Sequence, residues 1–259
     1  MAVDLRARAA GGGQVTPIGV GQWRLYLPPG EARGYRLAQL DDYAECRTRS
    51  DFPHSPPLRL SLRARASAPD LLGTWGFGFW NDPFGASLTV RGSGRRLPAL
   101  PDAVWFFHAS PPNHLALHDD HPACGFLAAT FSSRPLPPAV LVLAAPLAAG
   151  LFLSPTARIL RRLARRFIRE DAAVVDADVT AWHTYSLTWQ PEQVSFGLDG
   201  EVIFQTPVSP RGPLGLVLWV DNQYASLPPG GRLRFGNLST PEAAWLELAD
   251  VQLETSSGA

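Results

Sequence analysis

The chain has 259 residues, of which 46% are hydrophobic, and its 23 basic and 23 acidic side chains give a net charge of zero. This length is sufficient for one large domain whose core needs no disulfide bond or metal ion to be stable. The balanced charge argues against a nucleic-acid partner, because proteins that bind nucleic acid carry a basic excess.

The N-terminal segment, residues 1–20, is expected to be loosely ordered, and residues 21–259 are expected to form a single domain. The segment has no apolar stretch of signal-peptide length, which predicts a cytoplasmic protein that could associate with a membrane surface. Cys46 and Cys124 have no metal-ligand spacing, and a secreted disulfide scaffold would contain more cysteines. We therefore expect two free thiols in the core.

From Trp23 onward, short strand-like segments alternate with turns that account for most of the 25 proline and 23 glycine residues. This spacing predicts an all-β fold in which two antiparallel sheets stack face to face. The expected strands are 22–27, 35–40, 58–66, 74–80, 104–109, 125–131, 184–189, 194–198, 202–205, 214–220, 233–238 and 245–253.

Three histidines, His114, His118 and His121, lie in a proline-rich loop together with Asp119 and Asp120. Their spacing matches no established zinc motif, so we expect solvated loop histidines and no metal site. No cofactor is expected either, because the sequence contains no nucleophile motif, phosphate loop or dinucleotide fingerprint.

An insertion at residues 137–170 interrupts the β pattern and is expected to be helical. Ser154 and Pro155 are typical of a helix start, and hydrophobic residues then recur at helical spacing opposite a row of arginines. The preceding apolar run of about 15 residues is shorter than the ~20 that span a bilayer.

Three roles for the insertion remain open. Residues 154–170 could lie on an anionic membrane surface, or they could form a lid over an apolar cavity. The third possibility is a helical hairpin that packs on a sheet with its arginines solvated. The residues assigned to membrane or lid contacts are Arg158, Arg162, Arg165, Arg166, Arg169 and Phe167.

The clearest strand pattern in the chain is Trp182–Thr206. Every second residue from Tyr185 to Trp189 is apolar, and the alternation resumes after a short polar turn. Asp199-Gly200 then favours a tight hairpin turn before the next strand. A Trp-His pair, an aromatic strand ending in Trp and a strand ending in Asp-Gly together resemble glycoside hydrolase family 16 and its concanavalin A-like relatives.

The resemblance covers about two-thirds of the chain and leaves out 137–170. Residues 58–65 and 73–80 are similar to the family's paired strands, 215–224 to a strand that floors its cleft, and 245–253 to its closing strand. The resemblance implies a concanavalin A-like jelly-roll β-sandwich with a concave binding face, but it is only weakly specific for function.

Family 16 enzymes carry a Glu-x-Asp-x-x-Glu strand motif, since retaining hydrolysis needs two carboxyl groups about 5–5.5 Å apart. The corresponding strand here, Pro101–Ser110, reads PDAVWFFHAS and contains no glutamate. We therefore expect that the family's hydrolytic mechanism is absent, and that this floor suits an apolar ligand.

Asp82 and Asp221 are the candidate acid/base residues, because each follows an aromatic or apolar strand. An ordinary turn or a hydrogen bond in the core is the alternative role for each of them. The expected ligand-binding residues are Trp75, Trp80, Asn81, Trp105, Phe107, His108, Trp219, Asn222 and Tyr224.

Three functions are compatible with these patterns. The first, which we favour, is a non-hydrolytic protein whose concave sheet binds, or transforms, an apolar or amphipathic small molecule under a helical lid. The second is a carbohydrate-binding protein, or a glycosidase with relocated acids, in which tryptophans stack on sugar rings. The third is a peripheral membrane or interaction scaffold that docks through its arginine-rich helix.

Overall fold

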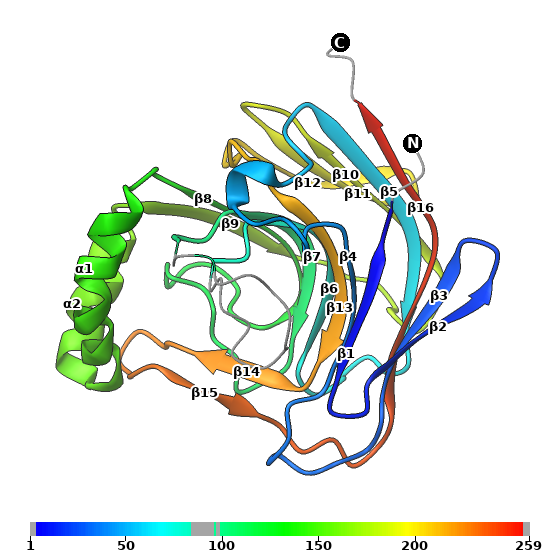
Figure 1. Cartoon of the computed structure of the whole chain (residues 1–259), viewed down its shortest axis with the longest axis horizontal. Helices are drawn as coiled ribbons and strands as arrows, with labels where there is room; N and C mark the ends of the chain where they lie inside the picture. The colour runs from blue at the N-terminus through cyan, green and yellow to red at the C-terminus, as the bar shows by residue number, and fades with distance from the viewer. Residues whose placement is uncertain (1–3, 84–95, 97–98, 256–259) are drawn as a thin grey trace.

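The computed structural model describes residues 4–83, 96 and 99–255. Two seven-stranded antiparallel sheets stack face to face as a β-sandwich, and a third sheet has two strands (Figure 1). The strand order is β1-β4-β13-β6-β7-β8-β9 in the first sheet and β12-β11-β10-β5-β16-β3-β2 in the second.

The first sheet contains β1 (Arg6–Ala10), β4 (Leu37–Asp41), β6 (Thr74–Trp80), β7 (Ala103–Ala109), β8 (Gly125–Ser133), β9 (Ile168–Val174) and β13 (Gly215–Asp221). The second contains β2 (Gln14–Gly19), β3 (Gln22–Leu27), β5 (Leu58–Ala66), β10 (His183–Trp189), β11 (Val194–Leu198), β12 (Glu201–Thr206) and β16 (Ala244–Thr255). The small sheet pairs β14 (Gln223–Ser226) with β15 (Arg234–Asn237).

The helical elements are α1 (Pro138–Ala148), α2 (Ser154–Ala164) and two 3-10 turns, Arg49–Asp51 and Ala149–Phe152. The expected insertion is thus helical, but it ends earlier than predicted, because residues 168–170 belong to β9. Among the described residues, no helix combines the length and hydropathy needed to cross a membrane.

The main core lies between the two large sheets. Alternation along β5 buries every second residue, and Leu60 and Leu62 are 2% exposed. From the opposite sheet, Phe77 and Phe79 of β6 are fully buried in the same cluster. Burial of large aliphatic and aromatic side chains on both inner faces is the main force that holds the sheets together.

Each strand expected from the sequence is present, with its ends shifted by two residues at most. Within the N-terminal segment that was expected to be loosely ordered, Arg6–Ala10 and Gln14–Gly19 form strands, because β1 pairs with β4 and β2 pairs with β3. Both strands are largely exposed, and β1 is held by ion pairs of Arg6 with Glu45 and of Arg8 with Asp41. A strand stabilised in this way lacks the hydrophobic alternation that sequence reading depends on.

The two cysteines are free, as expected, but neither is a core residue. Cys46 is half-buried and its thiol contacts the carbonyl of Asp51, whereas Cys124 is exposed.

The first sheet carries a second hydrophobic cluster on the face turned away from the core. Because side chains alternate along a strand, Phe77 and Phe79 point to the core while Trp105, Phe107 and Trp219 lie on the other face. Figure 1 shows the sheet curving around this side, toward the loop 110–124 and the helical hairpin. We call it the concave face.

Candidate functional site

A cavity of about 190 Å³ lies on the concave face, between strands β6–β9 and the loop 110–124. The sheet contributes Trp80, Trp105 and Phe131, and the loop contributes Leu115 and Ala116. The lining is almost entirely apolar, as is usual for sites that bind small molecules.

Trp105 is the centre of the aromatic side chains around the cavity. Its ring centroid lies 5.2 Å from that of Phe107, 5.5 Å from Trp219 and 5.9 Å from Trp80. Its indole Nε1 is buried and has no hydrogen-bond partner in the described part of the chain. A buried donor without an acceptor destabilises the folded chain.

One end of the cavity is polar, where His121, Glu170 and Asp171 join the lining. The register of β9 explains this placement, because Glu170 pairs with Phe131 and Ala172 pairs with Ala129 on the same face. Sequence reading does not bring these residues together, because it assigns Glu170 to the helical insertion and His121 to a solvated loop.

The loop histidines are only partly solvated, in contrast to the expectation. The backbone N–H of His118 donates to Glu170 Oε1 at 2.5 Å, and its Nδ1 lies 3.1 Å from the same oxygen. His114 Nε2 is buried without a partner among the described residues, and burial lowers the pKa of His114. The tertiary contact with β9, which no local spacing reveals, therefore shields part of this loop from solvent.

Helix α2 positions the loop but does not line the cavity. Arg161 is 3% exposed and donates to the carbonyl of Ala116 at 2.7 Å and to Asp119 Oδ1 at 2.5 Å. Arg165 donates to the carbonyl of Leu117 at 2.6 Å. The described lining contains no residue of α2, so this helix does not cover the cavity directly as a lid. It instead holds the loop 110–124 in place through hydrogen bonds.

Two of the expected ligand-binding residues lie in the interior. Trp75 is 1% exposed, belongs to the main core, and stacks on His108 with 5.3 Å between ring centroids. Burial lowers the pKa of His108 to about 4. Their parity along β6 and β7 is opposite to that of Trp80 and Trp105, so a ligand on the concave face does not reach them.

The turn after β6 is structural. Asn81 is buried, donates to the carbonyl of Leu100 and accepts from the backbone N–H of Asp102. Asp82 forms an ion pair with the buried Arg96 at 2.7 Å. Asp82 is therefore engaged in holding Arg96 instead of projecting as a free acid.

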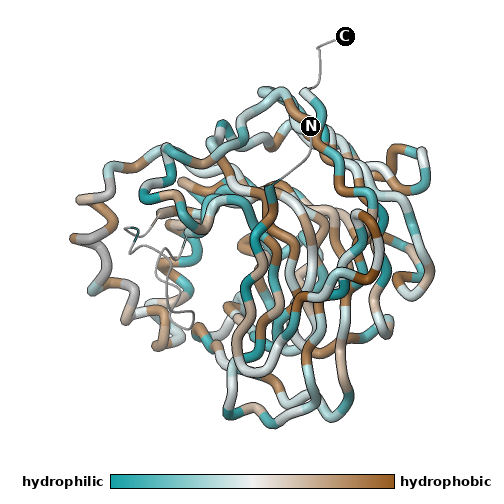
Figure 2. Tube along the Cα trace, turned by 45° about the vertical axis from the view of Figure 1, so that its right-hand side comes forward, coloured by the Kyte–Doolittle hydropathy of each residue, from teal (hydrophilic) through white to brown (hydrophobic). Residues whose placement is uncertain are grey.

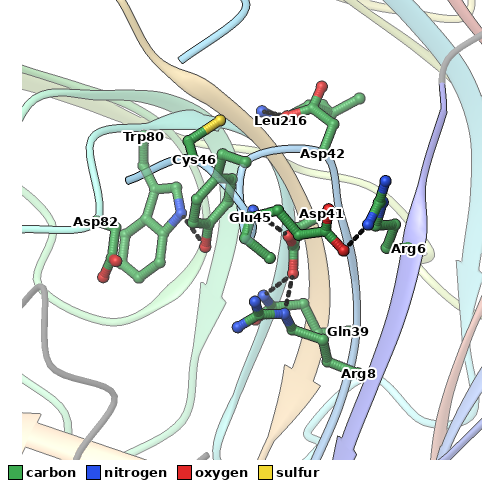
Figure 3. A network of polar contacts seen from close by, with 12 residues as sticks. Arg6, Arg8, Gln39, Asp41, Asp42, Glu45, Cys46, Trp80, Asp82 and Leu216 are labelled. Carbon is green, nitrogen blue, oxygen red and sulfur yellow. Dashed lines mark hydrogen bonds and ion pairs between the residues drawn. The ribbon is translucent and has the colours of Figure 1, made fainter. Parts of the chain in front are cut away.

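A polar network borders the concave face at β1 and β4 (Figure 3). Asp41 is fully buried and is contacted by Arg8 Nε at 3.1 Å, Gln39 Nε2 at 2.7 Å and the N–H of Ala44 at 2.9 Å. Burial raises the pKa of Asp41, and Arg8 opposes this effect. Sequence reading misses this acid because its ion-pair partner, Arg8, lies on β1, in a segment expected to be loosely ordered.

Asp221 is buried at the end of β13 and accepts hydrogen bonds from three residues. The donors are Thr74 Oγ1 at 2.7 Å, the N–H of Gln223 at 3.1 Å and the Tyr35 hydroxyl at 3.5 Å. Burial raises its pKa to about 6, although these donors oppose the shift. Asn222 is fully buried and donates to the carbonyls of Gly34 and Leu238.

The two candidate acids do not meet. Asp221 pairs with Thr74 at one end of β6, whereas Asp82 follows Trp80 at the other end. The seven-residue strand between them spans roughly 20 Å at about 3.3 Å per residue. Glycosidase carboxyl pairs lie within about 10 Å of each other, so Asp82 and Asp221 do not form one. Tyr224 lies on β14, outside the cavity lining.

Replacing Asp221 by asparagine is expected to increase stability more at pH 8 than at pH 5. In the folded protein the Asp221 carboxyl has a pKa of about 6, whereas in the unfolded chain its pKa is 3.8. Between these two pH values the folded protein keeps the proton and the unfolded chain releases it. Stability contributed at this site therefore falls as pH rises from about 4 to about 6. Urea unfolding should show that the free energy of unfolding of Asp221→Asn, relative to that of the wild type, rises by on the order of 1 kcal/mol between pH 5 and pH 8. A constant difference would contradict the raised pKa.

Solved structures share this architecture at very low sequence identity. A legume lectin-like domain from Entamoeba histolytica is 6% identical, with 98% of this chain and 90% of that chain covered and a TM-score of 0.50. A structure described as a native glycosidic hydrolase is 11% identical, with the same coverage and TM-score. The fold is a concanavalin A-like jelly roll.

Other comparisons add no family. The chain covers 17% of a sialidase chain, at 9% identity and a TM-score of 0.46. No protein-family profile matches the sequence, and no curated protein matches it. The similarity to lectin-like and glycosidase structures is therefore a similarity of fold alone.

Proposed function

We propose that the protein binds a small amphipathic molecule in the concave-face cavity, without cleaving it by the family 16 mechanism. The observation that carries the proposal is the cavity itself, whose described lining is aromatic and aliphatic except for His121, Glu170 and Asp171. An apolar ring with one or few oxygen atoms matches both parts of this lining.

The size of the cavity limits the ligand. At about 190 Å³ it is somewhat larger than an engineered apolar cavity of ~150 Å³ that binds benzene. A molecule built on one six-membered ring fits this volume. Its apolar body would lie against Phe131 and Ala129, and its polar group would face the end with His121 and Glu170.

The strand at the cavity floor supports a non-hydrolytic role. The residues of β7 that pair with the concave face of β8 are Ala103, Trp105, Phe107 and Ala109. None of them has a carboxyl group, whereas retaining hydrolysis needs a pair of carboxyl groups at the scissile bond. Aromatic rings also bind sugars, so a carbohydrate ligand is the alternative that the test must separate.

Two probes of equal ring size and opposite polarity test the proposal. Cyclohexanol is an apolar ring with one hydroxyl, and methyl β-D-glucopyranoside has polar groups around its ring. We expect saturable binding of cyclohexanol, with a Kd on the order of 1 mM for so few atoms, and no binding of the glucoside. Binding of the glucoside alone would favour the carbohydrate function, and binding of neither would refute the proposal.

The helical hairpin supports membrane docking as a second candidate function. Its exposed apolar side chains are unusually numerous, and four of them, Leu143, Leu147, Leu153 and Ile159, are 62–81% exposed. Exposed arginines lie on the same hairpin, and Figure 2 shows it at the periphery of the sandwich. An apolar surface beside basic residues is typical of proteins that bind anionic lipid.

The triple variant Leu147→Ser, Leu153→Ser, Ile159→Ser is expected to lose at least tenfold in affinity for phosphatidylserine-containing vesicles. Val202→Ser is the matched control, because Val202 is 60% exposed on β12 of the second sheet. Vesicle sedimentation at low and high salt measures both the affinity and its electrostatic part. Equal binding of the triple variant and the wild type would exclude docking through the hairpin.

A further inference from the structure

Two histidines of the loop and one glutamate of β9 form a compact group. One ligand atom from each of His118, His121 and Glu170 lies within 4.8 Å of the other two. The residues come from two segments about fifty positions apart, which the pairing of β9 with β8 brings together.

Glu170 has an unsatisfied oxygen at this place. Its side chain is 3% exposed, and Oε1 accepts from His118, whereas Oε2 is buried with no partner among the described residues. Leaving a carboxylate oxygen buried without a donor or cation is expensive. A bound cation would remove this cost.

We propose that His118, His121 and Glu170 bind one divalent transition-metal ion. Two imidazole nitrogens and one carboxylate are a donor set found in three-ligand zinc sites, whereas calcium and magnesium prefer all-oxygen sets. This proposal revises the expectation from the loop sequence, in which Glu170 has no part. It does not depend on which molecule fills the cavity.

The geometry needs only small side-chain movements. Ligand atoms about 2.1 Å from a tetrahedral zinc lie roughly 3.4 Å apart. His118 Nδ1 already lies 3.1 Å from one oxygen of the Glu170 carboxylate, and one donor atom from each of the three residues lies within 4.8 Å of the others, so short side-chain rotations reach this spacing. His121 and Glu170 also line the cavity, so the proposed site adjoins it.

Neighbouring acids fit roles outside the metal. Asp171 Oδ1 lies 3.9 Å from His121 Nδ1, where it can orient the ring, as carboxylates do for metal-bound histidines. Asp119, between the two histidines, is instead held by Arg161 and Arg165. The donor set therefore carries one negative charge from Glu170 and two neutral imidazoles.

Zinc titration of the full, EDTA-treated chain by calorimetry tests the proposal. We expect one Zn²⁺ per chain, with affinity reduced at least tenfold in His121→Ala and in Glu170→Gln. His183→Ala is the control. His183 Nδ1 pairs with Asp199 Oδ2 at 2.6 Å, and among the described residues His183 belongs to no group of three potential metal ligands. Cobalt(II) absorption should show a tetrahedral spectrum in the wild type and lose it in His121→Ala.

The two variants separate folding from binding. Glu170→Gln changes a buried residue that holds the loop, whereas His121 makes no described backbone hydrogen bond and its side chain is 23% exposed. A folded His121→Ala protein with wild-type zinc affinity would overturn the proposal. Absence of saturable zinc binding to the wild type would overturn it as well, and it would leave the cyclohexanol result unaffected.

Discussion

Replacing Ala172 by leucine is expected to reduce the affinity for cyclohexanol at least tenfold. Ala172 lines the cavity and lies beside Ala129, so the added isobutyl group occupies the space of the ligand. A tenfold loss corresponds to about 1.4 kcal/mol of binding free energy. Ligand titration followed by tryptophan fluorescence measures the change.

Ala173→Leu is the matched control for this variant. Ala173 is the next residue of the same strand, is also half-buried, and pairs with Ala128, which belongs to the main core and not to the cavity lining. The same side chain is thus added at the opposite face of β9. Equal affinities in the two variants would show that cyclohexanol binds elsewhere.

Arg161→Ala is expected to lower the free energy of unfolding by about 1–3 kcal/mol, because the carbonyl of Ala116 loses its donor. The loop over the cavity loses two of its hydrogen bonds at the same time, so cyclohexanol binding should weaken too. Urea unfolding and hydrogen exchange of the His118 amide, which is bonded to Glu170, report the two effects.

Arg162→Ala provides the comparison, since Arg162 is the exposed neighbour of Arg161 on the same helix. It should leave both stability and exchange unchanged. If the His118 amide exchanges at the wild-type rate in the Arg161→Ala protein, then Arg161 of α2 does not hold the loop in place.

The sandwich was predictable from local patterns, because hydrophobic alternation and turn residues act within a few positions of each other. Alternation along 58–66 and 184–189 gives the correct strands and the correct buried faces. The strand β1 escapes prediction because ion pairs with Glu45 and Asp41 hold it, and these partners lie more than thirty residues away.

The candidate site was predictable only in its aromatic part. Trp80, Trp105 and Phe107 were expected at a binding face and do line the cavity. Trp75 and His108 differ from them only in strand parity, which decides whether a side chain faces the core. The polar end depends on the register of β8 with β9, and no sequence pattern around Glu170 reveals that pairing.

Indole ¹⁵N–¹H NMR during a cyclohexanol titration tests the central claim most directly. The chain has eight tryptophans, and both Trp75 and Trp105 have a buried Nε1–H without a described partner. Of these two, only Trp105 lines the cavity, so its resonance, assigned with Trp105→Phe, should shift as the ligand contacts its ring, while that of Trp75 stays fixed. An unmoved Trp105 resonance at saturating cyclohexanol would contradict binding in the concave-face cavity.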